Sequence, residues 1–261
     1  MVEQSAVITH NLVLEMNKQD LTNMTSRLEL GGCVVAGVIR PGQALTMFRT
    51  GPGDDYHYLI AGGSNTNAKL AFRIRHENGS VVKEAKASEA GDRIYTTARE
   101  THNSTAKWNY EVVNTATSGD PVVATMMLTR SGTKGLTYKI GDLYKAFVSL
   151  SKQVKDMTDE NWGMFPGQAA ITGTLVAPGT ALTMGPYNMQ QHTFVLVGSD
   201  DQNKSWDLFL MKPNSETVFE SDTDTKDEPF ADLQGQSAVN IRVKNSGEKA
   251  SFMAYAVMRT P

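Results

Sequence analysis

Carboxylates concentrate in one run of the sequence, Asp222-Thr-Asp224-Thr-Lys-Asp227-Glu228. Alternating acidic side chains can present several hard oxygen atoms to Ca²⁺, so the run suggests calcium as the candidate cofactor, with Asp222, Asp224, Asp227 and Glu228 as ligands. The spacing does not fit an EF-hand, because the sixth residue from Asp222 is Asp227, where that loop requires glycine. A solvated acidic loop without a metal is the favoured interpretation.

Aromatic and histidine residues next to flexible loops suggest a second kind of site, because an aromatic ring can stack on a sugar ring. Tyr56 and His57 follow a loop rich in glycine and aspartate, and Tyr187 and His192 lie in the matching part of the second half of the chain. These four are the candidate ligand-binding residues. The alternative, which is favoured, is that such strand aromatics complete a hydrophobic core.

The sequence contains no recognisable catalytic motif. Its five histidines are scattered, without the His-x-x-x-His or His-Glu-x-x-His spacing of a metal site. No serine lies in a Gly-x-Ser-x-Gly elbow, and neither the phosphate-loop nor the dinucleotide glycine pattern occurs. We therefore predict that the chain is not an enzyme. A hydrolase whose catalytic residues come together from distant parts of the sequence stays open as an alternative.

The elements that would position these residues occur twice. Pro41-Gly-Gln-Ala-Leu-Thr-Met47 returns as Pro178-Gly-Thr-Ala-Leu-Thr-Met184, and an ordered series of weaker matches follows at offsets of 131 to 137 residues. Trp108-Asn-Tyr-Glu-Val112, for example, matches Val239-Asn-Ile-Arg-Val243. An internal repeat of this kind determines the architecture of the whole chain. The sequence therefore predicts a tandem duplication with two structural units of similar size.

Each copy contains many short segments in which apolar and polar residues alternate. Leu70, Phe72 and Ile74 lie on one face of such a segment and Arg73 and Arg75 on the other, the pattern of a strand half exposed to water. Turns of Gly, Asn and Ser separate the segments, as in β-sandwiches. We predict a mainly β fold of two tandem antiparallel jelly-roll-like β-sandwiches.

A segment between the two copies has the periodicity of a helix. Apolar residues recur there at intervals of three and four and so form one stripe: Leu143, Phe147, Leu150, Val154 and Met157. We expect an amphipathic helix that joins the sandwiches and packs against one or both. The predicted divisions are an N-terminal arm or short helix over 1–30, a first β-sandwich over 31–132, a helical connector over 133–167 and a second β-sandwich over 168–261.

The second copy resembles a known family. Asp207-Leu208-Phe209-Leu210, and Val239-Asn-Ile-Arg-Val243 before Asn245-Ser-Gly247, are similar to the bacterial pre-peptidase C-terminal domain over about His192 to Met258. The resemblance implies a non-catalytic jelly-roll-like sandwich of the kind appended to secreted hydrolases, in some members stabilised by calcium and in others binding a ligand. The first copy has Ala71-Phe72-Arg73-Ile74 in place of the Asp-containing stretch. No protease domain accompanies the two copies.

Composition excludes several classes of protein. A net charge of −3 gives no reason to expect nucleic acid as a partner. No window approaches the roughly 20 apolar residues of a membrane span. The lone Cys33 excludes an internal disulfide. The N-terminus shows no signal-peptide pattern, but scarce cysteine and abundant Thr, Ser and Asn favour a secreted or periplasmic location slightly.

Three functions follow from these features. The leading hypothesis is a non-catalytic tandem β-sandwich that binds a carbohydrate or another repetitive cell-surface ligand, because two sites on one body gain by avidity. The second is a self-assembling structural subunit of a shell, ring or capsid-like particle, in which the chain forms a homo-oligomer. The third is the hydrolase with a site not visible in the sequence.

Overall fold

The computed structural model describes residues 4–5, 7–11, 34–50, 56–63, 69–86, 93–96, 108–131, 141–156, 163–164, 167–200, 205–226 and 228–260 of the chain's 261. The chain divides into two compact units. The first consists essentially of Glu3–Gly141 with Phe165–Thr172, and the second of Asp142–Met164 with Gly173–Pro261.

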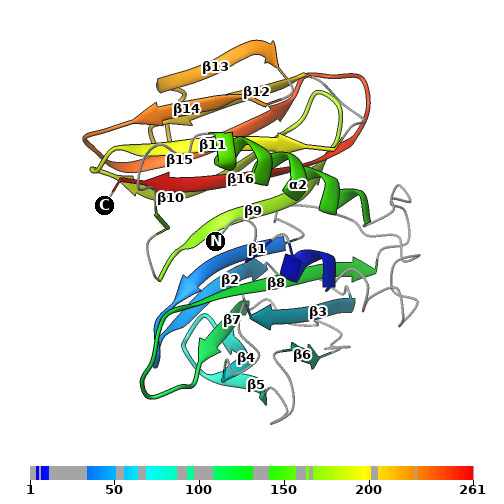
Figure 1. Cartoon of the computed structure of the whole chain (residues 1–261), viewed down its shortest axis with the longest axis vertical. Coiled ribbons are helices and arrows are strands. Elements are labelled where there is room, and N and C mark those ends of the chain that lie inside the picture. The colour runs from blue at the N-terminus through cyan, green and yellow to red at the C-terminus, as the bar shows by residue number, and fades with distance from the viewer. Residues whose placement is uncertain are drawn as a thin grey trace. The chain divides into compact units, whose positions relative to one another are not determined.

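The first unit is an antiparallel sandwich of eight strands (Figure 1). They are β1 (Val34–Ile39), β2 (Ala44–Thr50), β3 (Tyr56–Gly63), β4 (Leu70–His76), β5 (Val81–Lys86), β6 (Arg93–Thr96), β7 (Trp108–Asn114) and β8 (Val122–Ser131). One layer has the strand order β1-β8-β3-β6 and the other the order β2-β7-β4-β5. Its core contains alternate residues of these strands, including Phe72, Ile74, Tyr110 and Val112.

The second unit repeats this arrangement. Its strands are β9 (Ala169–Val176), β10 (Ala181–Met189), β11 (Thr193–Ser199), β12 (Trp206–Met211), β13 (Val218–Lys226), β14 (Phe230–Leu233), β15 (Gln236–Asn245) and β16 (Ser251–Arg259). The boundary between the two units falls within β9, after Thr172. The layers run β9-β16-β11-β14 and β10-β15-β12-β13, so every strand of the first unit corresponds to the strand eight places later. Both orders are those of a jelly roll. The predicted fold class is therefore confirmed.

The phrase that the two copies share forms the same turn in both. Gly42 and Gly179 have φ angles of 75° and 69°, which L side chains rarely adopt. Gln43 N donates to Arg40 O at 3.0 Å, and Thr180 N to Ala177 O at 3.1 Å. Proline followed by a glycine of positive φ is the signature of a type II turn. The phrase thus links the first two strands of each sandwich.

A buried asparagine holds this turn in each unit. The backbone N–H of Gly42 donates to Asn114 O at 2.9 Å, and that of Gly179 to Asn245 O at 2.8 Å. The side-chain amide of Asn114 donates to Ile39 O at 3.3 Å, and that of Asn245 to Val176 O at 2.9 Å. Both side chains are almost fully buried, at 1% and 0% exposed. Buried amides need such partners, so this arrangement stabilises both units in the same way.

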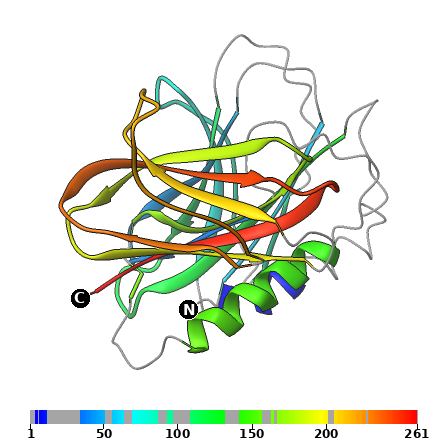
Figure 2. The same ribbon diagram turned by 90° about the horizontal axis from the view of Figure 1, so that it is seen from above.

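The helix α2 (Gly141–Asp156) belongs to the second unit and lies across its β9, β16 and β11 strands (Figures 1 and 2). Leu143, Phe147 and Leu150 of the predicted stripe are fully buried. Val154 is half-buried, and Met157 lies outside the described residues. The glycines on the covered strands leave room for the helix, because a Cβ at Gly198 would stand 2.6 Å from Ala146 O.

Little of the predicted N-terminal arm lies within the described residues. Residues 4–5 and 7–11 are helical, and the buried side chains among them are Ser5, Ile8 and Thr9. Spacings of three and four place these side chains on one helical face. Neither helix in the described part of the chain is long and apolar enough to cross a membrane.

Candidate functional site

A polar pocket lies on the side of the second unit where β13 and β14 meet. These two strands end their respective layers. We call this side the flank and its cavity the flank pocket. The pocket has a volume of about 320 Å³, at the small end of the range for ligand pockets. Its lining residues are Glu220, Ser221, Asp222, Thr223, Asp224, Phe230, Ala231 and Asp232.

The strand pairing explains why so many carboxylates gather in the flank pocket. Glu220 and Asp222 pair with Leu210 and Leu208 of β12, whose side chains are fully buried in the core. Directly opposed residues in a sheet share a face, so both carboxylates stand on the core-facing side of the outermost strand. At that edge the sandwich is open to water, and the acidic side chains can remain solvated.

Asp222 connects the two walls of the flank pocket. Its Oδ2 accepts a hydrogen bond from the backbone N–H of Phe230 on β14 at 3.2 Å, and its Oδ1 accepts from Asp224 N at 3.4 Å. Bonds from backbone N–H groups to a carboxylate are stronger than those between neutral groups. Asp222 therefore has a structural role in holding β14 against β13.

Phe230 and Asp232 form the β14 wall of the pocket. The ring of Phe230 is 51% exposed, unusually open for a large hydrophobic side chain. Asp232 Oδ2 lies 2.6 Å from His192 Nε2, and the His192 ring in turn lies 4.7 Å, centroid to centroid, from the ring of Phe194. The pocket lining thus includes Phe230 and the acidic member of an Asp–His pair.

The four predicted ligand-binding residues fall in different environments. His192 lies beside the flank pocket through its contact with Asp232. Tyr187 is buried in the core of the second unit, where its hydroxyl lies 2.8 Å from that of Tyr255, in agreement with the favoured core interpretation. Tyr56 and His57 are the first residues of β3, and their side chains lie outside the described part of the structure.

The predicted calcium ligands are only partly brought together. Asp222 and Asp224 line the flank pocket, whereas Glu228 accepts a hydrogen bond from Ser149 of α2 at 2.8 Å. Asp227 lies outside the described residues. Among the residues that are described, no group of three or more acidic, histidine or cysteine side chains is arranged to hold a metal ion. Calcium stays a prediction that the described geometry does not support.

The residues that carry the family resemblance meet one another in the structure. Asp207 of the Asp-Leu-Phe-Leu stretch accepts a hydrogen bond from Ser246 Oγ of the Asn-Ser-Gly stretch. Lys244 Nζ lies 3.4 Å from the same carboxylate oxygen. Asp207 is 9% exposed, and its two partners compensate for the cost of burying its charge. These contacts occupy the carboxylate of Asp207 and connect β12 to the end of β15.

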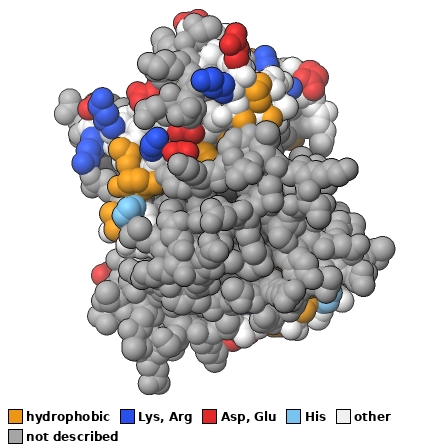
Figure 3. Space-filling view, turned by 90° about the vertical axis from the view of Figure 1, so that its right-hand side faces the viewer, with side chains coloured by type: hydrophobic (Ala, Val, Ile, Leu, Met, Phe, Trp, Pro, Cys, Tyr) orange, Lys and Arg blue, Asp and Glu red, His pale blue; other side chains and the backbone are white. Residues whose placement is uncertain are grey.

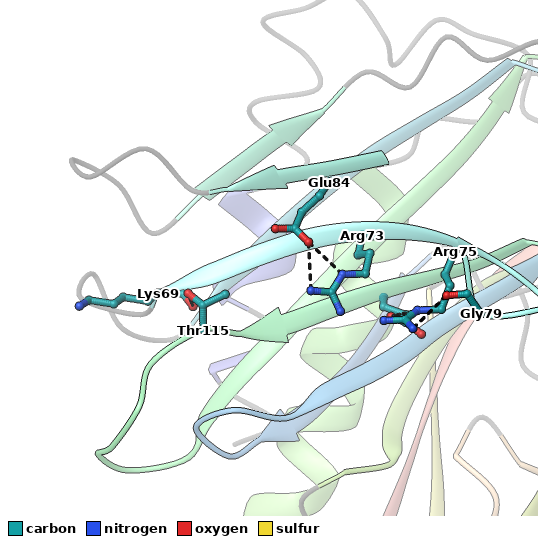
Figure 4. A network of polar contacts seen from close by, with 7 residues as sticks. Lys69, Arg73, Arg75, Gly79, Glu84 and Thr115 are labelled. Carbon is teal, nitrogen blue, oxygen red and sulfur yellow. Dashed lines mark hydrogen bonds and ion pairs between the residues drawn. The ribbon is translucent and has the colours of Figure 1, made fainter. Parts of the chain in front are cut away.

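The outer face of the layer that contains β4 is occupied by charged side chains in the first unit. Arg73 Nη2 lies 3.0 Å from Glu84 Oε2, and Arg75 donates to Gly79 O at 3.1 Å (Figure 4). Arg75 Nε also lies 3.3 Å from Glu111 Oε2. These ion pairs link β4 to its neighbours on both sides. The two arginines and two glutamates of this network neutralise one another. The network therefore has no net charge that would attract a charged ligand.

Charges of both signs also mix on the surface of the second unit. Acidic, basic and hydrophobic side chains lie side by side in the described part of the face drawn in Figure 3. Inside the unit, Arg259 stands opposite Thr193 in the β11–β16 pairing. Burial lowers the pKa of its guanidinium, which remains charged at physiological pH because an arginine ordinarily titrates far above that range. The described surface presents no basic stripe of the kind that nucleic acids require.

The chemistry available in the flank pocket is defined by its lining. Ionised carboxylates only accept hydrogen bonds, so a ligand must supply the donors, as sugar hydroxyls or ammonium groups do. An exposed ring can stack on the apolar face of a sugar or lie beside a cation. Anionic ligands would be repelled. Sequence reasoning missed Phe230, Asp232 and Glu220, because it did not reveal that β13 and β14 are neighbouring edges.

No family model matches the chain, and no curated protein matches it. Solved structures that it resembles include the PBSX exported protein XepA, at 12% identity over 85% of this chain and 84% of that one, with a TM-score of 0.24. The protein YhaK from Escherichia coli is 9% identical over 88% and 86%, with a TM-score of 0.22. The STIV MCP is 8% identical over 87% and 97%, also at 0.22.

Proposed function

We propose that this protein is a non-catalytic binding module whose second unit takes a polyhydroxylated ligand, a glycan, in the flank pocket. The observation that carries the proposal is that four acidic residues and Phe230, whose side chain is 51% exposed, line one polar cavity of about 320 Å³. Sugars present several hydroxyl donors around an apolar ring face, which matches this lining. The resemblance to pre-peptidase C-terminal domains also suggests a non-catalytic role.

The charge of the flank pocket narrows the class of glycan. Four carboxylates line it, from Glu220, Asp222, Asp224 and Asp232. Four carboxylates repel a further negative charge, so uronic and sialic acids are disfavoured, whereas neutral sugars and sugars with a free amino group are accepted. An amino sugar would bind less tightly as salt is added, because counter-ions screen its charge. The affinity for a neutral sugar would change little as salt is added.

We also propose that the two units arose by tandem duplication. The shared strand order, the shared Pro-Gly turns and the two equivalent buried asparagines support this proposal. Under it, a second binding site could have evolved at the position that corresponds to the flank. The register aligns Tyr95, which pairs with Ile60 of β3, with Phe230, which pairs with Leu196 of β11. Two aromatic positions on one chain would increase avidity for a repetitive polymer.

Glycan arrays followed by calorimetry test the binding proposal. Phe230→Ala should weaken binding about 3- to 10-fold, from the roughly 0.5–1.5 kcal/mol of a ring contact. Asp232→Asn should weaken it by about 10-fold or more, since hydrogen bonds to charged groups contribute roughly 1.5–3 kcal/mol. Matched controls are Val148→Ala on α2 and Glu248→Gln in an exposed turn, which leave the pocket unchanged.

Two results would count against the binding proposal. One is an array on which no neutral or amino glycan binds. The other is binding that Phe230→Ala and Asp232→Asn leave unchanged, which would place the glycan elsewhere. The hydrolase alternative has its own readout, release of reducing ends from a bound glycan. Turnover that Asp232→Asn abolishes would make the His192–Asp232 pair part of an active site.

Self-assembly is the second candidate function. Its specific support is the exposure of valines on edge strands of both units, Val81 at 50% and Val82 at 38% on β5, and Val218 at 44% on β13. Hydrophobic side chains on an unpaired edge are a usual feature of strands that associate with another chain. Size-exclusion chromatography with light scattering tests this function. A particle mass equal to one chain at every accessible concentration would exclude it.

A further inference from the structure

The strongly exposed hydrophobic side chains gather at the ends of layers. Among the described residues, the large ones are Val7, Val81, Val82, Val148, Val218 and Phe230. Four of these six lie on β5, β13 or β14, each the last strand of its layer within its unit. A chain of this size has hydrophobic side chains scattered singly over its surface, but their concentration on edges indicates a contact surface.

Both β5 and β13 are edge strands, the last in the order of their sheets. β5 pairs with β4, and β13 with β12, and within the described strands neither has a ladder partner on its other side. The β4–β5 pairing has one irregularity, between Ile74 and Arg75, and Lys83–Lys86 pairs regularly beyond it. The β12–β13 pairing has two, between Trp206 and Leu208 and between Leu210 and Met211, and Glu220–Asp222 pairs regularly between them. Neither strand contains proline, which would block a further ladder.

The charges of the two edges are opposite at the equivalent position. Lys83 pairs with Ile74 of β4, and Glu220 pairs with Leu210 of β12, so the two residues occupy the same place in the jelly roll. β5 as a whole has two lysines and one glutamate, and Arg73 already pairs with that glutamate. β13 has three acidic residues and one lysine. Two β5 edges would repel each other, as would two β13 edges, whereas a β5 edge and a β13 edge would attract.

We propose that β5 of one copy of this chain adds to β13 of a second copy, and that the chain associates head to tail through this strand pairing. The proposal rests on the second candidate function, self-assembly, and names its contact. Backbone hydrogen bonds supply the pairing, exposed valines lie on both edges, and the net positive sequence of β5 complements the net negative sequence of β13. Such a heterologous contact generates a ring or an open filament rather than a two-fold dimer.

Charge reversal with rescue tests the contact. Lys83→Glu and Glu220→Lys should each raise the dissociation constant between copies at least about tenfold, because each turns an attractive charge pair into a repulsive one. The double variant should return to within about threefold of the wild type. The measurement is sedimentation velocity over a concentration series at low and at high salt. Lys249→Glu, in an exposed turn of the second unit, is the matched control.

The Lys83→Glu variant separates this contact from binding in the flank pocket, because Lys83 lies in the first unit while every residue of the flank pocket lies in the second. It should lose association and keep the wild-type affinity of the flank pocket for a monosaccharide, which cannot bridge two sites. A wild-type chain that stays monomeric would overturn self-assembly and the contact together. A wild-type chain that associates, but equally well with Lys83→Glu and Glu220→Lys, would overturn the contact alone.

Zero-length crosslinking keeps the test valid if a charge variant folds poorly. Equal amounts of unlabelled and ¹⁵N-labelled wild-type chain are mixed and treated with a carbodiimide, which joins a lysine amine to a carboxylate in direct contact. Mass spectrometry should find a β5 peptide joined to a β13 peptide in the mixed-isotope form that only two different copies can give. Crosslinks from β5 only to other segments would overturn the proposal.

Discussion

The two units have the same internal bonds at their turns and different chemistry at their edges. Asn114 and Asn245 hold the Pro-Gly turn through the same backbone and side-chain hydrogen bonds. On the edge strands, by contrast, the position of Lys83 in the first unit is that of Glu220 in the second. The repeated phrase is therefore a requirement of folding. The residues that differ between the copies are where we look for function.

The helix on the second unit provides the largest expected effect. A Cβ at Gly198 would stand 2.6 Å from Ala146 O and 2.8 Å from Leu150 Cα, backbone atoms that can move only if α2 moves. We expect Gly198→Ala to destabilise the second unit by about 3 kcal/mol, the upper part of the range for overpacking. Urea unfolding followed by hydrogen exchange and mass spectrometry measures each unit separately. Gly163→Ala is the control, because open space surrounds the new methyl group. An equal loss of stability in the two variants would mean that α2 does not press on β11.

The asparagine pair sharpens the comparison, because its bonding is more extensive in the second unit. The Asn245 amide also donates to Lys249 O at 2.8 Å, and its Oδ1 accepts from Gly247 N at 3.0 Å. The Asn114 side chain accepts from Ala116 N at 3.1 Å. Unmade buried bonds cost about 1–3 kcal/mol, so we expect Asn245→Ala to cost roughly 2–3 kcal/mol and Asn114→Ala roughly 1–2.

The same hydrogen-exchange experiment assigns each loss to its unit. Asn188→Ala is a suitable control, because that exposed side chain accepts only a local bond, from Gln190 N at 3.0 Å. If both asparagine variants have the effect of this control, the shared turns do not depend on the buried amides, and the Pro-Gly phrase must be repeated for another reason.

The ion pairs of the outer faces give the smallest expected effect. Arg75 and Glu111 of the first unit are 31% and 12% exposed, whereas Arg242 and Glu216 of the second are 37% and 90% exposed. Double-mutant cycles with alanine should give a coupling of about 0.5–1 kcal/mol for the first pair and none measurable for the second. A larger coupling in the second pair would reverse this ranking of the two faces.

Much of the fold could be predicted from local patterns. The repeat indicated two like units, the alternation of Leu70, Phe72 and Ile74 indicated a strand, and the stripe from Leu143 to Leu150 indicated the helix. The repeat depends only on comparing two stretches of sequence, and the strand and helix signals depend on residues close together in the sequence. The turn at Gly79, with its φ of 89°, was also visible for that reason.

The candidate site could not be predicted in the same way. The acidic run pointed to the correct stretch, but Phe230 and Asp232 complete the pocket only because β13 and β14 are neighbouring edges of different layers. That neighbourhood depends on the order of eight strands, which no local pattern encodes. For Tyr187 the local pattern was misleading. It lies near a loop in the sequence, but in the fold it is a core residue whose hydroxyl group forms a hydrogen bond with that of Tyr255.

The strand order also determines how easily such units can be joined. In the first unit the opening strand β1 and the closing strand β8 lie side by side and antiparallel, with Val34 opposite Met127. The chain therefore enters and leaves the sandwich at one end. A polypeptide with this property can be cut at an internal loop and religated through a short bridge between its old termini. Copies of it can also be joined in series at the genetic level, because the first and last strands of each added sandwich pair with each other.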